Sequence, residues 1–588
     1  MKGKIMSRLF VIFCAVLMLS GIFVFCGCGG PAEQAPPPKP PEPKELVLPP
    51  AEGGIPTTSL LKLTPESAQL SIALPSLADG LDKIAQTAKR FYSAEEVDEW
   101  LQDKVGQLAS FAGTPDAKSL IEVAEARGFD IMKPMGAFAD FSPSFDSILA
   151  LLTPPAGESQ EKIKLESIDW EQVKQPNWAV MLGVKDKEKV ETSLKELAVE
   201  IPEINATAPK EVIVDGAKVI DYGVYAYFIT GEYVTVGSTS TVKGVASRFS
   251  SPCAIRYGTS EIPSAPYPEG VVLVKDWKLI PMINKIMPVL VQASPYALIG
   301  QLKTTAWGEM LPDGEDPAYI CFSLNPGEKM EIRTFLDLAK RPQSASILGE
   351  AKPMQLPKIL PDNTQAALLL QLTNEYKTYL NQKAMPEVKK TFENTKGVAQ
   401  GFQYGVSAMQ LLGNELGVAI TSSMGDFPAI VIVTQASNVE QVKALLDMLV
   451  PSMSDESYRE IPLKKLAVPS PIPITLVMVE DKLIASNNTD VLKMMIDWIL
   501  DKQTSGYMAG LKPPLGSEIP RYNFISIQSK LLLDTIFPLM KIMGQDLGGA
   551  QRDVEKVLSE IQEVRIMNEK KGNLLEGQIT TYFVPKSS

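Results

Sequence analysis

The hydrophobic positions of this chain form short apolar runs and amphipathic stretches that recur, in the same order, in its two halves. Apolar strands are predicted at 70–74 and 366–372, each after a proline-containing turn and each before a helix. A second pair of strands is predicted at 135–139 and 416–420. Single matches of this kind are common, so their number and order carry the argument.

Four further blocks continue the correspondence. They are a strand with a following amphipathic helix, a hairpin with a following helix, a strand with a helix that contains proline, and a closing pair of strands. The matched ranges are 179–184 with 429–434, 225–236 with 474–485, 268–279 with 520–531, and 318–335 with 564–583. The prolines in the helices, Pro288 and Pro538, predict a kink or break in each. Six blocks in one order predict a tandem duplication, with repeats at 57–345 and 346–588.

The predicted fold class is α+β: each repeat is a mostly antiparallel or mixed sheet packed with helices. Strands outnumber helices and several form hairpins, which favours antiparallel pairing over a strict βαβ unit. The runs 366–370 and 429–433 do not alternate between apolar and polar residues, which is typical of strands covered on both faces. Either helices and the other repeat cover the two faces, or one face lines an apolar cavity.

A different pattern occupies residues 1–28. Basic residues precede an unbroken apolar run, 9–25, which ends at Cys26-Gly27-Cys28. This order is typical of a secretory signal. A cysteine after a small residue resembles the signal of bacterial lipoproteins, in which that cysteine is acylated and becomes the new N-terminus. The resemblance implies a signal peptide at 1–28 and a lipidated Cys28.

Two alternatives to this anchor stay open. Lipidation at Cys26 would place the bulky Phe25 at the cut. An uncleaved membrane helix is the other alternative, because the apolar run approaches the roughly 18 residues of the shortest spanning helix. In every case the N-terminal positive charge predicts a body outside the cytoplasm and tethered to a membrane. Gly29 follows Cys28 where retained lipoproteins carry Asp, so the resemblance implies the outer membrane or cell surface if the organism has two membranes.

Residues 29–56 are predicted to be a linker between the anchor and the body. The proline-rich stretch 36–43 favours polyproline II, which is extended and stiff. At about 3.1 Å per residue, such a linker would hold the body up to roughly 85 Å from the membrane.

Composition narrows the function. The net charge is −12, and removal of the three basic residues of the signal leaves 54 basic against 69 acidic residues, a net −15. An acidic body argues against nucleic acid as a partner and against electrostatic adhesion to anionic lipid. The chain has no histidine, which excludes Ser-His and Cys-His nucleophile pairs and the usual histidine zinc sites.

The body retains two cysteines, Cys253 and Cys321. They are candidates for one disulfide, because an exported protein meets an oxidising compartment. Two small buried apolar residues are the alternative interpretation. Two thiols do not suffice for a Cys₄ or Cys₃His metal site, and the sequence predicts no metal and no cofactor.

Two motifs resemble reactive sites weakly. Ser240-Thr241-Val242-Lys243 has the spacing of serine-lysine acyl enzymes, but the companion motifs are absent, so a helix cap with a solvated lysine is predicted. In the other repeat, Thr489 and Leu492 are expected at the positions of Ser240 and Lys243. The acidic stretch 313–316 lacks the ligand spacing of a calcium loop and is interpreted as a solvated turn.

The sequence therefore predicts a membrane-anchored envelope lipoprotein with a binding or structural role rather than an enzyme. The alternative is a carrier that holds lipid or another apolar ligand in a groove of the α+β repeats. The body is similar in pattern to exported and lipid-anchored bacterial proteins of unknown function with tandem strand-helix blocks. That resemblance implies no functional residues.

Overall fold

The computed structural model divides the chain into two compact units, Met1–Leu336 (unit 1) and Asp337–Ser588 (unit 2). The division lies a few residues before the predicted boundary at 345/346. The described residues are 48, 56–152, 172–200, 208–253, 270–275, 277–279, 281–282, 317–379, 381–382, 412–422, 428–449, 456–466, 474–503, 505–511, 519–538 and 549–585. Each unit combines an antiparallel sheet with helices, so the α+β class is confirmed.

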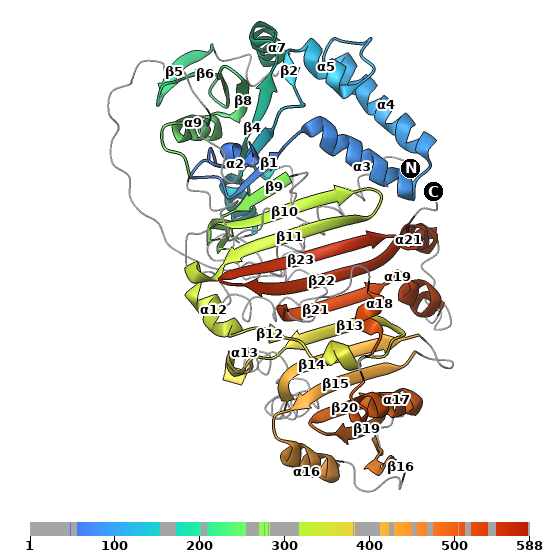
Figure 1. Ribbon diagram of the computed structural model, residues 1–588. Coiled ribbons are helices and arrows are strands. Elements are labelled where there is room, and N and C mark those ends of the chain that lie inside the picture. The colour runs from blue at the N-terminus through green and yellow to red at the C-terminus, as the bar shows by residue number, and fades with distance from the viewer. Residues whose placement is uncertain are drawn as a thin grey trace. The chain divides into compact units, whose positions relative to one another are not determined.

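The sheet of unit 1 contains ten antiparallel strands in one continuous order and one additional short strand. Its strands are β1 (Leu70–Leu74), β2 (Phe129–Asp130), β3 (Met135–Asp140), β4 (Asn177–Val184), β5 (Lys210–Val214), β6 (Ala217–Asp221), β7 (Tyr225–Ile229), β8 (Tyr233–Ser238), β9 (Gly270–Val274), β10 (Ala318–Asn325) and β11 (Lys329–Asp337). They pair in the order β11-β10-β9-β1-β3-β4-β8-β7-β6-β5, and β2 pairs with the end of β4 (Figure 1).

Helices fill the connections of unit 1. They are α2 (Pro56–Leu61), α3 (Leu77–Phe91), α4 (Ala94–Phe111), α5 (Leu120–Ala126), α6 (Ser142–Leu152), α7 (Lys187–Glu200) and α9 (Thr239–Arg248). α4 begins where the sequence favours it, because Ser93 and Glu96 form a reciprocal capping box. α9 packs on β4, β7 and β8 and buries Val242 and Val245 against them.

The sheet of unit 2 is also antiparallel. Its strands are β12 (Lys352–Pro353), β13 (Thr364–Gln371), β14 (Leu412–Thr421), β15 (Ile430–Ala436), β18 (Lys464–Leu466), β19 (Ile474–Val479), β20 (Lys482–Ser486), β21 (Pro520–Gln528), β22 (Ile561–Lys571) and β23 (Leu574–Phe583). They pair in the order β23-β22-β21-β13-β14-β15-β20-β19-β18, with β12 on the end of β21. β16 (Ser457–Tyr458) and β17 (Ile461–Pro462) form a separate two-stranded ribbon.

Helices fill the connections of unit 2, and some of them build its core. They are η3 (Leu338–Lys340), α12 (Pro342–Leu348), η4 (Leu356–Ile359), α13 (Asn374–Tyr379), α16 (Val439–Leu449), α17 (Thr489–Leu500), α18 (Tyr507–Gly510), α19 (Ser529–Leu531), η6 (Leu532–Ile536) and α21 (Gly549–Ser559). Asn488 caps α17, whose Leu492 and Ile496 are fully buried among core residues such as Val431. The distortion predicted at Pro538 is a π-turn over η6, which precedes it.

The two units have the same strand order. Nine strands of each sheet correspond one to one. In unit 1 they are, in spatial order, β11-β10-β9-β1-β3-β4-β8-β7-β6, and in unit 2 they are β23-β22-β21-β13-β14-β15-β20-β19-β18. Ile72 faces Ala137 on the neighbouring strand, as Leu368 faces Val418, which agrees with the sequence alignment of those blocks.

The register of one block differs from the alignment made from sequence. Val180 faces Ala137, and Ile432 faces Val418, so the equivalent of Val180 is Ile432 and not Ile430. A shift of two residues leaves every side chain on the same face of a strand. The apolar pattern alone therefore gives no means of choosing between these two registers.

Candidate binding surface and cavity

A line of apolar side chains crosses one face of the unit 2 sheet and is only partly covered. The face toward α17 holds the core, with Leu369, Val431 and Phe524 almost fully buried. On the opposite face, cross-strand neighbours align in a line that crosses eight strands from β19 to β23. We name it the apolar row: Leu476, Ala485, Ile432, Val418, Leu368, Ile525, Ile566 and Ile579.

The side chains of the apolar row are half-buried or exposed. Ile432 is 43 % exposed, and Ile430 and Ile527, which lie on the same face two residues along their strands, are 42 % and 37 % exposed. Leaving apolar side chains in contact with solvent costs about 25 cal/mol of free energy per Å² of exposed apolar surface. Large exposed apolar patches in soluble proteins mark binding surfaces.

Unit 1 has a corresponding line, but much of it is buried. It runs through Ile220, Tyr227, Val236, Val180, Ala137, Ile72, Val272 and Ile320. Tyr227, Val272 and Ile320 are each less than one-tenth exposed, whereas Trp178, on the same face of β4, is 43 % exposed. The partly exposed apolar face is therefore better developed in unit 2.

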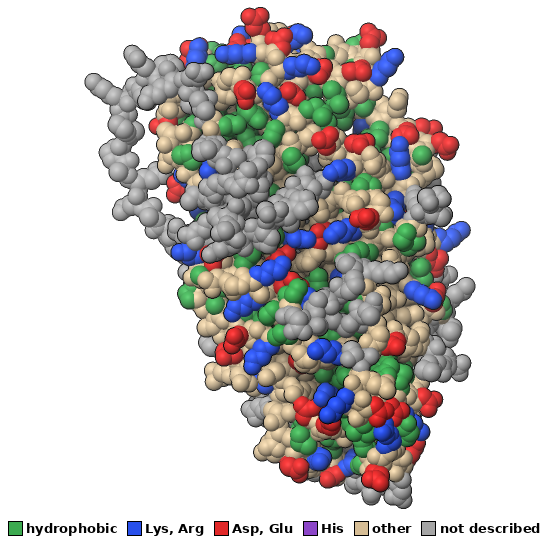
Figure 2. Space-filling view, viewed as in Figure 1, with side chains coloured by type: hydrophobic (Ala, Val, Ile, Leu, Met, Phe, Trp, Pro, Cys, Tyr) green, Lys and Arg blue, Asp and Glu red, His purple; other side chains and the backbone are tan. Residues whose placement is uncertain are grey.

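Charged groups are dispersed on the visible surface. Figure 2 shows lysine and arginine interspersed with aspartate and glutamate over the described side chains of the face it draws. Hydrophobic side chains lie between these charged groups, and neither sign of charge dominates the face that is drawn.

A buried lysine holds the turn that precedes β1. Lys275 directly follows β9, is 8 % exposed, and donates from Nζ to the carbonyl oxygens of Pro65 at 2.6 Å and Glu66 at 3.1 Å. Lys278 donates to the Glu66 carbonyl as well, at 2.6 Å. Burial lowers the pKa of Lys275 to about 8, and the neighbouring positive charges of Lys278 and Arg248 act in the same direction.

The equivalent position in unit 2 is Gln528. Leu70 faces Val274 on β9, and Ala366 faces Ile527 on β21, so the next residues, Lys275 and Gln528, occupy corresponding places. Gln528 also reaches the preceding turn, through a hydrogen bond from Nε2 to the Thr364 carbonyl at 3.3 Å.

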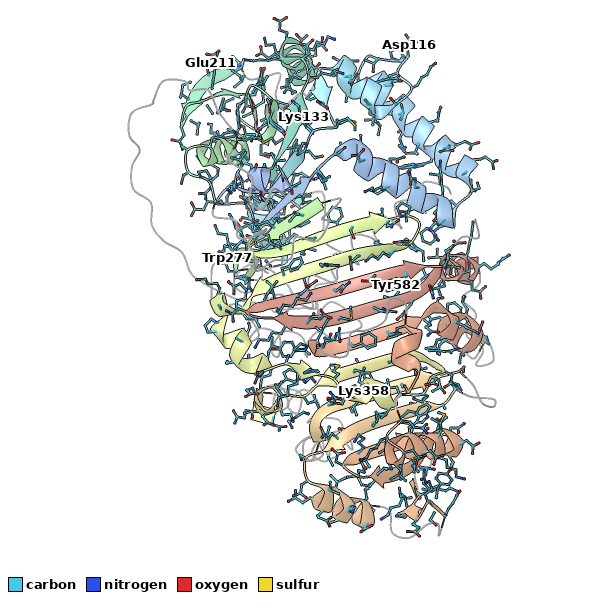
Figure 3. The ribbon with its side chains drawn as sticks, in the orientation of Figure 1. Asp116, Lys133, Glu211, Trp277, Lys358 and Tyr582 are labelled. Carbon is cyan, nitrogen blue, oxygen red and sulfur yellow. The ribbon has the colours of Figure 1, made fainter. Side chains whose placement is uncertain are left out.

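Beside Gln528 there is a cavity of about 140 Å³. It is lined by Asp362, Tyr507, Gly510, Leu511, Gln528, Gln562 and Glu563. Lys358, labelled in Figure 3, lies near the start of the turn that carries Asp362. Burial raises the pKa of Tyr507 to about 12. The Tyr507 hydroxyl lies near Ser526 but forms no hydrogen bond within the usual geometric limits.

Buried charges form a network on the core face of β21, β22 and β23. Arg565 pairs with Glu563 through two hydrogen bonds of 2.6 and 2.8 Å. Its guanidinium lies 4.6 Å from the ring centre of Tyr582. Tyr582 is labelled in Figure 3. Arg521 donates to Glu569 at 2.8 Å. The side chains of Arg565 and Arg521 are 2 % and 4 % exposed, so their partners lie in a dry environment.

Cys253 and Cys321 are both thiols in the structure, so it does not contain the candidate disulfide. Cys253 follows α9, and its Sγ donates to the Thr64 carbonyl at 3.2 Å. Cys321 is buried within β10, opposite Val271 of β9. The alternative interpretation of two small buried residues holds for Cys321, whereas Cys253 is only half-buried.

The prediction for Ser240 and Lys243 was wrong in two respects. Ser238 is the cap residue of α9, and Ser240 is an exposed residue within the first turn. Lys243 is not simply solvated, since its Nζ is 2.7 Å from Asp221, whose pKa is lowered. Burial on its own raises the pKa of Asp221, but hydrogen bonds from Lys243 and the Gly223 N–H outweigh it.

The correspondence of Lys243 with Leu492 was also wrong. α9 buries Thr241, Val242, Val245 and Ala246, and α17 buries Val491, Leu492, Met495 and Ile496. Alignment of these buried positions matches Lys243 with Lys493, which lies 3.5 Å from Glu456. An ion pair therefore occurs at the same helical position in both units.

Other predicted sites lie outside the described residues. These are Cys28, residues 29–47 and 49–55 of the linker, and the acidic stretch 313–316. Within the part of the chain that the structure describes, no helix is long and apolar enough to cross a membrane. Among those same residues, no cluster of His, Cys, Asp and Glu side chains has the composition to hold a metal ion.

Sequence reasoning overlooked the buried charge network and the lysine after β9, although each leaves a signal. In β22, residues of opposite charge and one methionine occupy alternate positions: Glu563, Arg565, Met567, Glu569 and Lys571. A period of two places them on one face of the sheet. Lys275 ends a run of four apolar residues, which is an unusual place for a solvated lysine.

Comparison with known proteins adds no relative. No protein-family model, no curated protein and no solved structure matches this chain.

Proposed function

We propose that this chain is an exported, membrane-anchored envelope protein that acts by binding, with the apolar row of unit 2 as its contact surface. The supporting observation is the continuous line of apolar side chains across eight strands, with Ile432 43 % exposed. The body is acidic and has no histidine, the commonest general base, and a proline-rich stretch precedes it; these features favour a binding role over a catalytic one.

The proposal includes a tandem duplication of one α+β unit. The shared strand order supports it, and so does a matching backbone contact. The N–H of Cys253 donates to the carbonyl of Lys62 at 2.8 Å, and the N–H of Ser505 donates to that of Lys358 at 2.7 Å. In both units the chain that follows the α9 or α17 helix thus returns to the turn before the first strand.

A carrier of lipid or another apolar ligand is the second candidate. The observation that favours it is the length of the apolar row, because an extended acyl chain contacts several strands at once while a side-chain anchor contacts few. Mass spectrometry of lipid that copurifies with the protein distinguishes the two. Stoichiometric lipid supports a carrier, and a crosslinked envelope protein without lipid supports a docking surface.

The apolar row is tested by placing charge on it. Ile430→Lys and Ile432→Lys each add a cation to the exposed part of the face, so we expect at least a tenfold weaker Kd for the fluorescent apolar probe N-phenyl-1-naphthylamine. Val554→Lys on α21 is the matched control, because Val554 is also 43 % exposed but belongs to a helix and not to a strand of the apolar row. Equal probe affinity in all three variants would exclude the apolar row as the binding surface.

The anchor has its own test. If Cys28 is the lipidated residue, the mature chain begins there, and mass spectrometry should find an acylated N-terminal peptide. Cys28→Ser should then release the chain from the membrane fraction or leave the precursor uncleaved, whereas Cys14→Ser should change neither result. An intact peptide that spans residues 9–25 in the mature protein would instead establish the uncleaved helix.

A further inference from the structure

The β16–β17 ribbon of unit 2 has the place in the chain that the hairpin of β5 and β6 has in unit 1. Each follows the corresponding helix, α16 or α7, and each precedes the corresponding strand, β19 or β7. In the described parts of the chain, the hairpin of unit 1 has five residue pairs, whereas the ribbon has two, Ser457 with Pro462 and Tyr458 with Ile461. The ribbon therefore has far fewer backbone contacts of its own to keep it in place.

The turn of the ribbon is strained. Its two central residues, Arg459 and Glu460, have φ values of 51° and 66°, which residues other than glycine rarely adopt. The equivalent turn of unit 1 has Asp215 and Gly216, which accept positive φ values much more readily. The ribbon turn therefore favours another backbone conformation, and contacts outside the ribbon must hold it.

Those contacts come from one stripe of α17. Arg459 lies 2.9 Å from both Asp497 and Asp501, which are one helical turn apart. The Tyr458 hydroxyl donates to Asp497 at 2.9 Å, and the Lys493 ammonium lies 5.7 Å from the centre of the Tyr458 ring. Positions 493, 497 and 501 are spaced by four, so the ribbon follows α17 along its axis. We name the ion pairs of Arg459 with Asp497 and Asp501 the latch.

Solvent and ions reach the latch. All three of its side chains are more than one-third exposed. Hydrogen bonds from Arg459 hold the pKa of Asp501 below its ordinary value, so the pair is charged near neutral pH. Salt weakens exposed ion pairs of this kind. Behind the latch, in contrast, Tyr458 and Ile461 pack against the hydrophobic core of unit 2.

We propose that the β16–β17 ribbon is a strap that opens and closes over α17, with the strained turn favouring the open state and the charged latch the closed one. Opening takes Tyr458 and Ile461 out of the core, which exposes the apolar surface that they cover. Ionic strength sets the balance, because salt screens the latch and leaves the turn unchanged. The strap lies on the α17 side of the sheet, opposite the apolar row, so each proposal can fail without the other.

The first experiment measures hydrogen exchange of the full chain at low and at high NaCl concentration, about 0.05 M and about 1 M. We expect the amides of 456–463 to exchange about fivefold faster at high salt, because the latch is screened. The hairpin 210–221 of unit 1 is the internal control, since its longer ladder and favourable turn should keep its exchange nearly constant. Equal acceleration in both segments, or none in 456–463, overturns the proposal.

The second experiment uses variants that act in opposite directions. Asp501→Asn removes one charge of the latch and should speed exchange in 456–463 about threefold. Glu460→Gly relaxes the turn, keeps the latch and should slow the same exchange about threefold. Glu440→Gln is the matched control, because it removes an exposed charge of α16 that pairs with Lys443 and should leave 456–463 unchanged.

The urea midpoint of unfolding separates local opening from global unfolding. It should be nearly the same in the wild type and in Asp501→Asn, because only the strap opens. No change of exchange in Asp501→Asn, or faster exchange in Glu460→Gly, overturns the proposal. Faster exchange in Asp501→Asn that is accompanied by an equal loss of global stability would also overturn it.

Discussion

Replacing Arg565 by methionine should destabilise unit 2 by about 3–5 kcal/mol, because it leaves the Glu563 carboxylate buried without its cation. Glu563 and Arg565 are 6 % and 2 % exposed, and two hydrogen bonds join them. The variant also loses the contact between the guanidinium and the ring of Tyr582. Urea denaturation of the full chain, followed by a probe in unit 2, measures the change.

Arg459→Met is the matched control. Arg459 also makes two charged contacts, with Asp497 and Asp501 at 2.9 Å each, but its side chain is 41 % exposed. Solvent screens such pairs, so this variant should change the midpoint far less. The double variant Glu563→Leu/Arg565→Met should recover much of the lost stability, since a buried ion pair replaced as a whole is often tolerated. Equal losses in Arg565→Met and Arg459→Met would contradict the importance of burial.

Stability of unit 1 should rise with pH between about 8 and 10.5 because of Lys275. Burial lowers the pKa of Lys275 to about 8 in the folded state, whereas the unfolded chain has the ordinary lysine value near 10.4. Between these values the unfolded state binds more protons, so deprotonation favours the folded state. This stabilising contribution of Lys275 is complete above the lysine pKa of the unfolded chain, near 10.4, and is lost as the pH falls through the folded-state pKa of about 8. Its full size is about 3 kcal/mol.

The measurement is the free energy of unfolding at several pH values from 7.5 to 9.5, before most tyrosines titrate. Lys275→Met removes the titrating group, so its profile should lack this rise. Lys278→Met loses a hydrogen bond to the same Glu66 carbonyl and should keep the rise. The charged neighbours that bear on Lys275 are Lys278, Arg248 and Glu66, with the Cys253 thiol also close. Parallel profiles for wild type and Lys275→Met would refute the assignment.

Strand positions were predicted well where apolar runs stand between clear turns. β1 has the predicted limits, β7 begins where the predicted hairpin 225–236 begins, and β23 ends where the predicted block 564–583 ends. The hairpin of β5 and β6 was missed, although Asp215-Gly216 supplies the positive φ values of 48° and 95° that a tight hairpin turn requires. The Asp215-Gly216 turn is therefore a strong local signal that was overlooked, because the sequence comparison of the two repeats considered only blocks that occur in both.

The apolar row was only half predictable. Non-alternating runs indicated strands that are apolar on both faces, and this is what β13 and β15 show. Yet sequence pattern does not reveal how much solvent reaches each face. The exposure of Ile430 and Ile432 depends on what other elements cover, which is a tertiary property. The cavity beside Gln528 was likewise beyond reach, because its walls come from four separate stretches of chain.

The pairing of the first strand in each unit constrains how the protein is made. β1 pairs on one side with β3 and on the other with β9, and β13 likewise pairs with β14 and with β21. Leu70 therefore pairs with Val274, and Ala366 with Ile527, only after these distant residues have been synthesised. During synthesis from the N-terminus, one edge of the first strand of each unit therefore stays unpaired until β9 or β21 has been made. Such edges pair readily with other chains, so this topology makes the partly synthesised protein more prone to aggregation than the folded one.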